Sequence, residues 1–169
     1  KKAVMAHMKE ELKNGHQIYV VTPLIDESEA IDTANANEVY NNMLNRRSIR
    51  KFKCDAIKDE DIDVMLKAAM AAPSACNKQP WEFYVIKNSD KLSMVKASGR
   101  YTNMNAPLAI VVCGNQDRCL SKKDNDFFIQ DCSSAITHIL LCAESLGLGS
   151  LWCGAYPMDS VVNKLRTAL

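Results

Sequence analysis

The sequence predicts one compact globular domain with a short appendage, in which helices are combined with a few short strands. Its 169 residues fit the usual size of a single domain, about 100–200 residues. Hydrophobic residues make up 47% and charged residues 24%, a balance that is typical of globular proteins and excludes a disordered or fibrous chain. Apolar residues recur at helical spacing in several segments, whereas others form short runs typical of strands.

The charge of the chain is almost balanced. Lys and Arg number 21 against 20 Asp and Glu, which leaves a net charge of +1 and no overall drive towards nucleic acid or anionic lipid. Any anion site must therefore be local. No apolar run approaches the roughly 20 residues that cross a bilayer, and Lys1 and Lys2 lead into a charged amphipathic stretch rather than a signal peptide. We expect a cytoplasmic protein.

Cysteines and histidines show no pattern of disulfides or metal ligands. The seven cysteines form no Cys-x-x-Cys pair and several lie in apolar runs, so we expect reduced and mostly buried thiols. The histidines, His7, His16 and His138, are scattered, and His138 falls in an apolar helical pattern where packing is more common than catalysis. We expect no zinc or other metal site.

The N-terminal segment predicts a helix, a strand and a connector. Residues 2–13 place apolar side chains at helical spacing, and Asn14-Gly15 provides the stop. Residues 16–25 form a β-rich run, with a proline near its end. The acidic, Ala- and Asn-rich residues 26–37 indicate a connector.

The next segment predicts two helices and a strand. A short helix is expected from about Asn37 to the basic cluster that begins at Arg46. Residues 59–71 have acidic residues in the first turn, where the helix dipole favours them, and Pro73 ends this helix. A turn-rich stretch then leads into a strand at 82–86.

The last segment predicts three helices around one strand. Residues 89–98 form a small helix, and the continuous apolar run at 108–114 indicates a buried strand. Residues 126–146 predict a long, heavily buried helix that two glycines end. Residues 151–154 form a short strand or turn, and residues 158–168 a final helix.

Two segments contain candidate ligand-binding residues. In NRRSIRKFK, residues 45–53, the side chains of Arg46, Ser48 and Arg50 share a face if the segment is extended, and guanidinium groups bind phosphate oxygens in pairs. By charge alone, a solvated basic turn is the favoured interpretation. In PSACNKQPW, residues 73–81, the amides offer donors and acceptors to a heterocycle edge, although an ordinary polar loop has the same composition.

Other familiar signatures are missing from the sequence. Gly147-Leu148-Gly149 follows a helix rather than a strand, so it is a helix cap and not a dinucleotide fingerprint. The sequence contains no Walker-type phosphate loop, no Ser/His/Asp signature and no recognisable pair of carboxylates. We expect no catalytic acid, base or nucleophile from the chain itself, so a cofactor would carry any reaction.

Residues 37–169 resemble the FMN-dependent nitroreductase family. The matching stretches, in order, are RRSIRKF at 46–52, AAPSACNKQPWEFYVI at 71–86, APLAIVVCG at 106–114 and FFIQDCSSAITHILLCAESLGLGSLWCGAYP at 127–157. The resemblance implies an α+β fold, a nitroreductase-like three-layer sandwich with a mixed or antiparallel sheet between helices. It also implies a homodimer with FMN at the subunit interface.

The resemblance carries the family's flavin-binding positions onto this sequence. They are Arg46, Arg47, Ser48 and Arg50 for the ribityl phosphate and pyrimidine side; Pro73, Ser74, Ala75 and Asn77 for a loop that approaches from the partner subunit; Cys153 and Gly154 for the turn facing flavin N5; and Asn103 or Asn105 for a flavin-contacting asparagine. A fixed cation such as Arg50 would stabilise negative charge on the pyrimidine side.

The activity implied by the resemblance is that of an NAD(P)H-dependent flavoprotein oxidoreductase. NAD(P)H would reduce FMN and leave, and a nitroaromatic, quinone or similar acceptor would then take the electrons in a ping-pong reaction. The sequence does not distinguish NADH from NADPH or identify the acceptor. We also expect the chain to end before the C-terminal strand and arm of other family members.

Residues 1 to about 36 resemble a different family. AHMKEELKNGHQIYVVTPLIDESEAID is similar to the start of the second motor lobe of RecG-type DNA helicases, without their ATP-binding motifs. We expect no helicase activity and interpret this piece as part of a chimeric chain, since so short a fragment rarely folds alone. Its strand would then pair with an open sheet edge of the nitroreductase-like domain.

Two alternative functions follow from this composite organisation. A fusion protein could keep the dimeric fold while binding FMN weakly, with no useful turnover. A helicase-derived fragment that binds nucleic acid is disfavoured by the balanced charge and by the absence of a basic face studded with aromatic residues.

Overall fold

The computed structural model describes residues 33–120 and 127–169 and divides the chain between Ala36 and Asn37 into two units. We describe the second unit. The helix predicted at 2–13, the strand predicted at 16–25 and its pairing with a sheet edge lie outside the described residues. The last residues of the predicted connector are helical, because the helix expected from Asn37 already begins at Thr33.

The structure confirms the predicted order of helices and strands within these ranges. In chain order they are α2 (Thr33–Asn45), α3 (Asp59–Met70), the 3-10 turn η1 (Ala75–Asn77), β1 (Trp81–Ile86), α4 (Ser89–Ser98), β2 (Ala109–Gly114), the 3-10 turn η2 (Gln116–Arg118), α5 (Phe127–Ser145) and α6 (Asp159–Ala168). Residues 151–154 form no strand and are irregular, and the turn lies just beyond them at 156–157.

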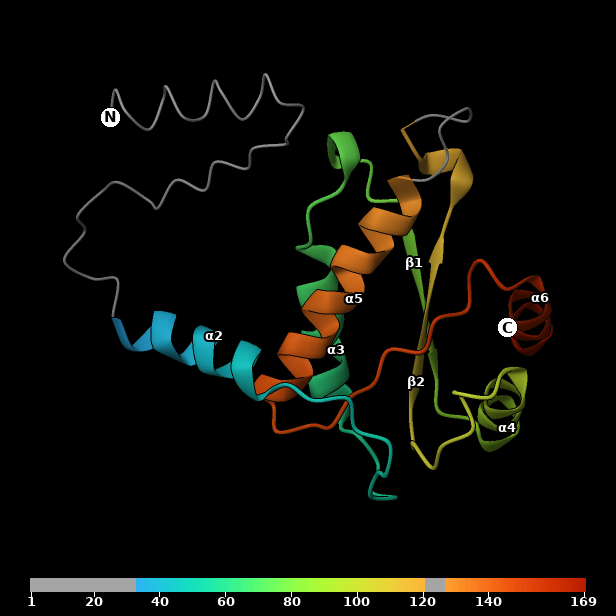
Figure 1. The fold of residues 1–169 in the computed structure, drawn as a ribbon, viewed down its shortest axis with the longest axis horizontal. Helices are drawn as coiled ribbons and strands as arrows, with labels where there is room; N and C mark the ends of the chain where they lie inside the picture. Colours follow the sequence, from blue (N-terminus) through green and yellow to red (C-terminus); the bar gives the residue numbers. More distant parts are fainter. Residues whose placement is uncertain (1–32, 121–126) are drawn as a thin grey trace, which may run out of the picture. The chain divides into compact units, whose positions relative to one another are not determined.

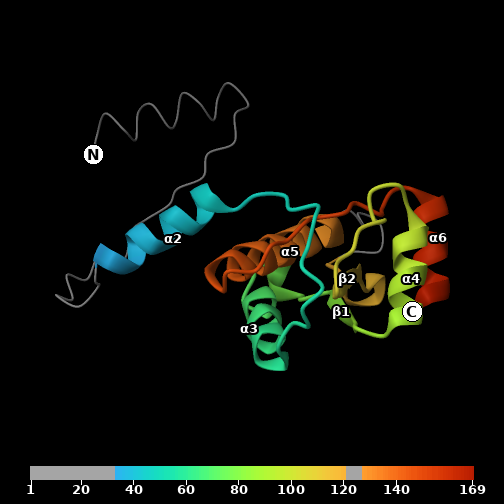
Figure 2. The same cartoon turned by 90° about the horizontal axis from the view of Figure 1, so that it is seen from below.

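The main elements form three layers (Figures 1 and 2). Strands β1 and β2 pair antiparallel, with Trp81 opposite Gly114 and Ile86 opposite Ala109. Helices α3 and α5 cover one face of this sheet, and α4 and α6 cover the other. Since both faces are covered, each strand presents apolar side chains alternately to the two helical layers. The nitroreductase-like sandwich expected from the resemblance is therefore present.

The larger core lies between α3, α5 and the sheet. Its helical residues recur three or four positions apart, so they form one stripe on each helix. They are Ile62, Met65 and Ala69 of α3, and Cys132, Ala135, Ile139 and Ala143 of α5. Ala69 and Ala135 are 0% exposed, because small side chains let the two helices approach closely. Phe83, Ile110 and Val112 of the strands pack against this cluster.

The smaller core lies on the opposite face of the sheet. It contains Ile86, Leu92, Val95 and Ala168, with Ala109, Val111 and Leu165 packed against them. Asn88 begins α4 by accepting backbone N–H bonds from Asp90 and Lys91, which satisfies donors that the helix leaves free at its first turn. This layer positions the loop between α4 and β2.

Two burial predictions are wrong. Every residue of β2 is only partly buried, because β2 pairs with β1 alone among the described residues and a two-stranded sheet shields its strands incompletely. The seven thiols are free, but only Cys132 is buried, whereas Cys54 and Cys76 are exposed. An apolar run shows that a segment packs, but not how completely its neighbours cover it.

In the described part of the chain, no helix is long and apolar enough to span a membrane.

His138 packs as expected. Its Nδ1 lies 3.0 Å from the carbonyl oxygen of Ala68, which links the middle of α5 to the end of α3. The ring is partly buried in this contact between helices. The described residues contain no group of three or more His, Cys, Asp or Glu side chains that could hold a metal ion.

Candidate functional site

The arginine segment, residues 46–53, is held beside the chain that follows α5. Ser48 and Ser150 form an isolated parallel bridge, and the Ile49 N–H donates to the Ser150 carbonyl oxygen at 3.0 Å. Gly149 permits this approach, because a Cβ there would lie 3.1 Å from the Ile49 side chain. The glycine that ends the α5 region therefore also makes room for the arginine segment.

A second attachment fixes the other end of the arginine segment. Asn105 Oδ1 accepts from the Phe52 N–H at 3.0 Å, and its side-chain amide donates to the Phe52 carbonyl oxygen at 2.5 Å. Asn103 lies elsewhere, in an open hollow that it shares with Lys96, Arg100 and Lys164. Of the two asparagines that the sequence left as alternatives, Asn105 is the one bonded to the arginine segment.

Within the described part of the chain, no carboxylate neutralises the arginines of the arginine segment. Arg50 Nη1 donates to the Ser48 carbonyl oxygen at 3.2 Å, and Arg47 donates to the carbonyl oxygens of Leu44 and Arg46. Among residues 33–120 and 127–169, no carboxylate forms an ion pair with any of these arginines. Arg47 and Arg50 are exposed and Arg46 is partly exposed. Unpaired guanidinium groups on a fixed backbone suit the binding of a phosphate or another anion.

The irregular stretch of residues 151–154 lies next to Arg50. The Cys153 thiol donates to the Tyr101 carbonyl oxygen at 3.2 Å. Burial raises the pKa of the Cys153 thiol above its ordinary value, and the Arg50 guanidinium offsets part of this rise, so the thiol and the cation are electrostatic neighbours. A Cβ added to Gly154 would meet nothing within 4 Å among the described residues. The backbone at Gly154 is therefore open to a ligand within the described structure.

The loop of residues 73–79 has an unusual backbone. Cys76, Asn77 and Gln79 have positive φ angles of 48°, 53° and 46°, in the left-handed region that L-residues rarely adopt. Ser74 supports this shape, since its carbonyl oxygen accepts from the Asn77 N–H and its Oγ from the Gln79 N–H, both at 2.9 Å. Such strained turns are common where a backbone is shaped for a ligand.

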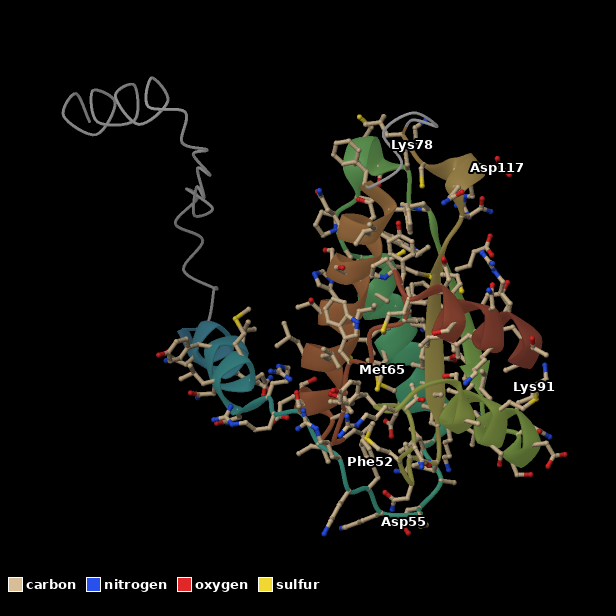
Figure 3. All side chains as sticks on the ribbon, turned by 45° about the vertical axis from the view of Figure 1, so that its right-hand side comes forward. Phe52, Asp55, Met65, Lys78, Lys91 and Asp117 are labelled. Carbon is tan, nitrogen blue, oxygen red and sulfur yellow. The ribbon has the colours of Figure 1, made fainter. Side chains whose placement is uncertain are left out.

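The two predicted groups of site residues lie far apart within one chain. The arginine segment precedes α3 and the loop of residues 73–79 follows it, and the 12 residues of α3 span about 18 Å. Figure 3 shows Phe52 and Lys78 towards opposite ends of the described unit. The arginine segment, Asn105, Cys153 and Gly154 therefore form one cluster, and the residues of the loop form another.

Asp131 is a buried polar residue that the sequence interpretation missed. Its carboxylate contacts the loop, because Oδ1 accepts from the Ala75 N–H at 2.8 Å. The signal was present in the sequence, since Asp131 lies four residues before the fully buried Ala135, on the apolar face of the predicted helix. A carboxylate at such a position indicates a specific partner.

Comparisons with known proteins agree with this fold. The model of the nitroreductase family matches residues 43–102 and 95–168. An Archaeoglobus fulgidus protein described as an NADH dehydrogenase/NAD(P)H nitroreductase is 47% identical over 126 residues, which cover 73% of this chain and 71% of that protein.

Solved structures show the same similarity. A protein of Bacteroides thetaiotaomicron with the same description is 37% identical and has a TM-score of 0.71, over 77% of this chain and 75% of that one. A Desulfovibrio desulfuricans nitroreductase in complex with FMN is 29% identical and has a TM-score of 0.66, over 78% of this chain and 73% of that one. Sequence motifs, layers and relatives agree, and the chain therefore belongs to the nitroreductase family of oxidoreductases.

Proposed function

We propose that this chain is the subunit of a homodimeric, FMN-dependent oxidoreductase that transfers electrons from NAD(P)H to nitroaromatic, quinone or similar acceptors in a ping-pong reaction. The observation that carries the proposal is the arginine segment, whose Arg46 and Arg50 pair with no carboxylate among the described residues and whose Ser48 lies beside Ser150, close to the open Gly154. The names of the Archaeoglobus relative and of the FMN-bound Desulfovibrio structure support the donor and the cofactor.

The residues of this cluster suit FMN. The cofactor would supply the hydride and electron chemistry for which the chain has no side chains of its own. Arg46 and Ser48 hold its phosphate, because a guanidinium and a hydroxyl offer several N–H and O–H donors to phosphate oxygens. Arg50 places a fixed positive charge near the pyrimidine side, where negative charge is stabilised best by a preorganised cation. The open space at Gly154, where an added Cβ would meet nothing within 4 Å among the described residues, suits the approach of the flat ring system.

The homodimer is supported by the separation of the two clusters. Figure 3 shows Lys78 of the loop and Phe52 of the arginine segment towards opposite ends of the described unit, so a second copy supplies Pro73, Ser74, Ala75 and Asn77 if all contact one flavin. Helix α2 also exposes an apolar stripe of four residues, each more than half exposed: Val39, Tyr40, Met43 and Leu44. Exposed apolar stripes of this kind are typical of surfaces that a partner subunit covers.

The proposal predicts a yellow protein that releases flavin on denaturation. The double variant Arg46→Ala/Arg50→Ala should lose flavin while keeping its circular dichroism spectrum, and its melting temperature should match that of the flavin-free wild type, because Arg50 is exposed and Arg46 is only half-buried. Arg118→Ala, which removes an exposed arginine from η2, is the matched control and should keep the flavin. Colourless wild-type protein that takes up no added FMN would overturn the proposal, and unchanged flavin retention in the double variant would refute the phosphate assignment.

A further inference from the structure

Only one of the two carboxylate oxygens of the buried Asp131 has a hydrogen-bond partner within the described residues. Asp131 is 5% exposed and lies near the start of α5. Its Oδ1 accepts from the Ala75 N–H at 2.8 Å, whereas its Oδ2 is buried without a hydrogen-bond partner in that part of the chain. Burying a carboxylate is costly unless hydrogen bonds compensate, so a residue needed only for packing would be apolar at this position.

The partner of Asp131 is the first residue of a strained turn. Ala75 begins η1, and the left-handed residues Cys76 and Asn77 follow it directly. The hydrogen bonds of Ser74 close the turn on itself but do not attach it to the rest of the fold. The bond from Ala75 to Asp131 reaches a residue 56 positions further along the chain, on a helix of the larger core. It therefore fixes where the turn lies.

We infer that Asp131 is a positioning residue for the loop of residues 73–79. Its Oδ1 holds the Ala75 amide, so that the turn is already in its left-handed shape before a ligand arrives. This inference rests on the proposed function, in which that loop contacts the flavin bound by a partner subunit. A preformed turn loses little conformational freedom on binding, whereas a loose turn must be ordered at the expense of affinity.

The test compares two substitutions at Asp131 with a matched control. Asp131→Ala removes the acceptor, and the dissociation constant for FMN should rise by roughly tenfold or more, as expected for loss of a charge-assisted hydrogen bond. Asp131→Asn keeps a carbonyl oxygen that can accept from Ala75 and should restore most of the affinity. Ser98→Ala also removes a buried side chain that makes hydrogen bonds, but in the α4 layer, and should leave FMN affinity unchanged.

A second measurement separates this inference from the proposed function. Hydrogen exchange at the Ala75 amide of the flavin-free protein should accelerate in Asp131→Ala, while the amides of α5 and β1 keep their protection. If exchange at Ala75 is unchanged, or if Asp131→Ala binds FMN as the wild type does, the positioning role is refuted while the proposed function stands. If wild-type protein binds no FMN, the proposed function fails, and the exchange experiment still decides whether Asp131 holds the turn.

Discussion

Replacing Gly149 by alanine tests whether close packing positions the arginine segment. The new methyl carbon would lie 3.1, 3.1 and 3.2 Å from three carbon atoms of Ile49, whereas such contacts are favourable at about 3.5–4.0 Å. The contacting atoms include the Cβ of Ile49, which cannot move away unless the backbone of the segment moves too. We therefore expect Gly149→Ala to displace the residues that carry Arg46 and Arg50.

The expected magnitude comes from two opposing effects. Overpacking of this kind costs about 1–3 kcal/mol. Because the contact distances to Ile49 are only a few tenths of an ångström too short, we expect a cost in the lower half of that range. Alanine also restricts the unfolded chain, which stabilises a protein by about 0.4–1 kcal/mol where the backbone conformation allows it. The steric effect is larger, so the free energy of unfolding should fall by about 1 kcal/mol, and FMN should be retained less well.

Urea unfolding of the flavin-free protein measures this effect. The midpoint should shift to lower urea with an unchanged slope, because the area exposed on unfolding stays the same. In an Ile49→Ala background, where two of the three contacting atoms are absent, Gly149→Ala should cost clearly less. Equal costs in the two backgrounds, or no cost in either, would show that packing between Gly149 and Ile49 does not hold the segment.

Two further predictions concern the turn after α5 and the thiols. Gly154→Ala should leave the urea midpoint unchanged or raise it slightly, since its Cβ meets nothing within 4 Å in the described structure, yet it should weaken FMN retention because the methyl group occupies the space proposed for the flavin. Unchanged retention would remove Gly154 from the site. At pH 8, a thiol reagent followed by mass spectrometry should label the exposed Cys54 first and Cys132 last, because burial raises the pKa of Cys132 to about 12. Since this pKa lies above the ordinary value of 9.0, the contribution of Cys132 to stability is present below about pH 9 and is lost as the pH rises towards 12. Early labelling of Cys132 in folded protein would contradict its burial.

Local sequence patterns were sufficient for most helices and both strands of the described unit. The helices that begin at Asp59 and Ser89 agree with their predicted starts, because an acidic first turn and an asparagine cap act within a few residues of the chain. The arginine segment was also evident in advance, since three arginines within five positions need no tertiary information to be noticed.

Contacts between distant segments could not be obtained in this way. The choice between Asn103 and Asn105 depends on which loop residue meets Phe52, more than fifty positions away. The partial burial of β2 depends on how many strands pair with it, which its own apolar run does not encode. The position of Asp131 on an apolar helix face marks it in the sequence, but its partner, the backbone amide of Ala75, is set by the fold alone.

The sequence by itself therefore determined the order of the helices and strands, the family and the cationic character of one segment. These properties depend on side-chain chemistry and on the periodicity of neighbouring residues. Only the tertiary structure decided which predicted site residues lie together in one chain, that Gly149 makes room for Ile49, and that Asp131 holds the turn at Ala75. Such features are distances between segments far apart in sequence, and periodicity reports which face of an element is apolar but not what packs against it.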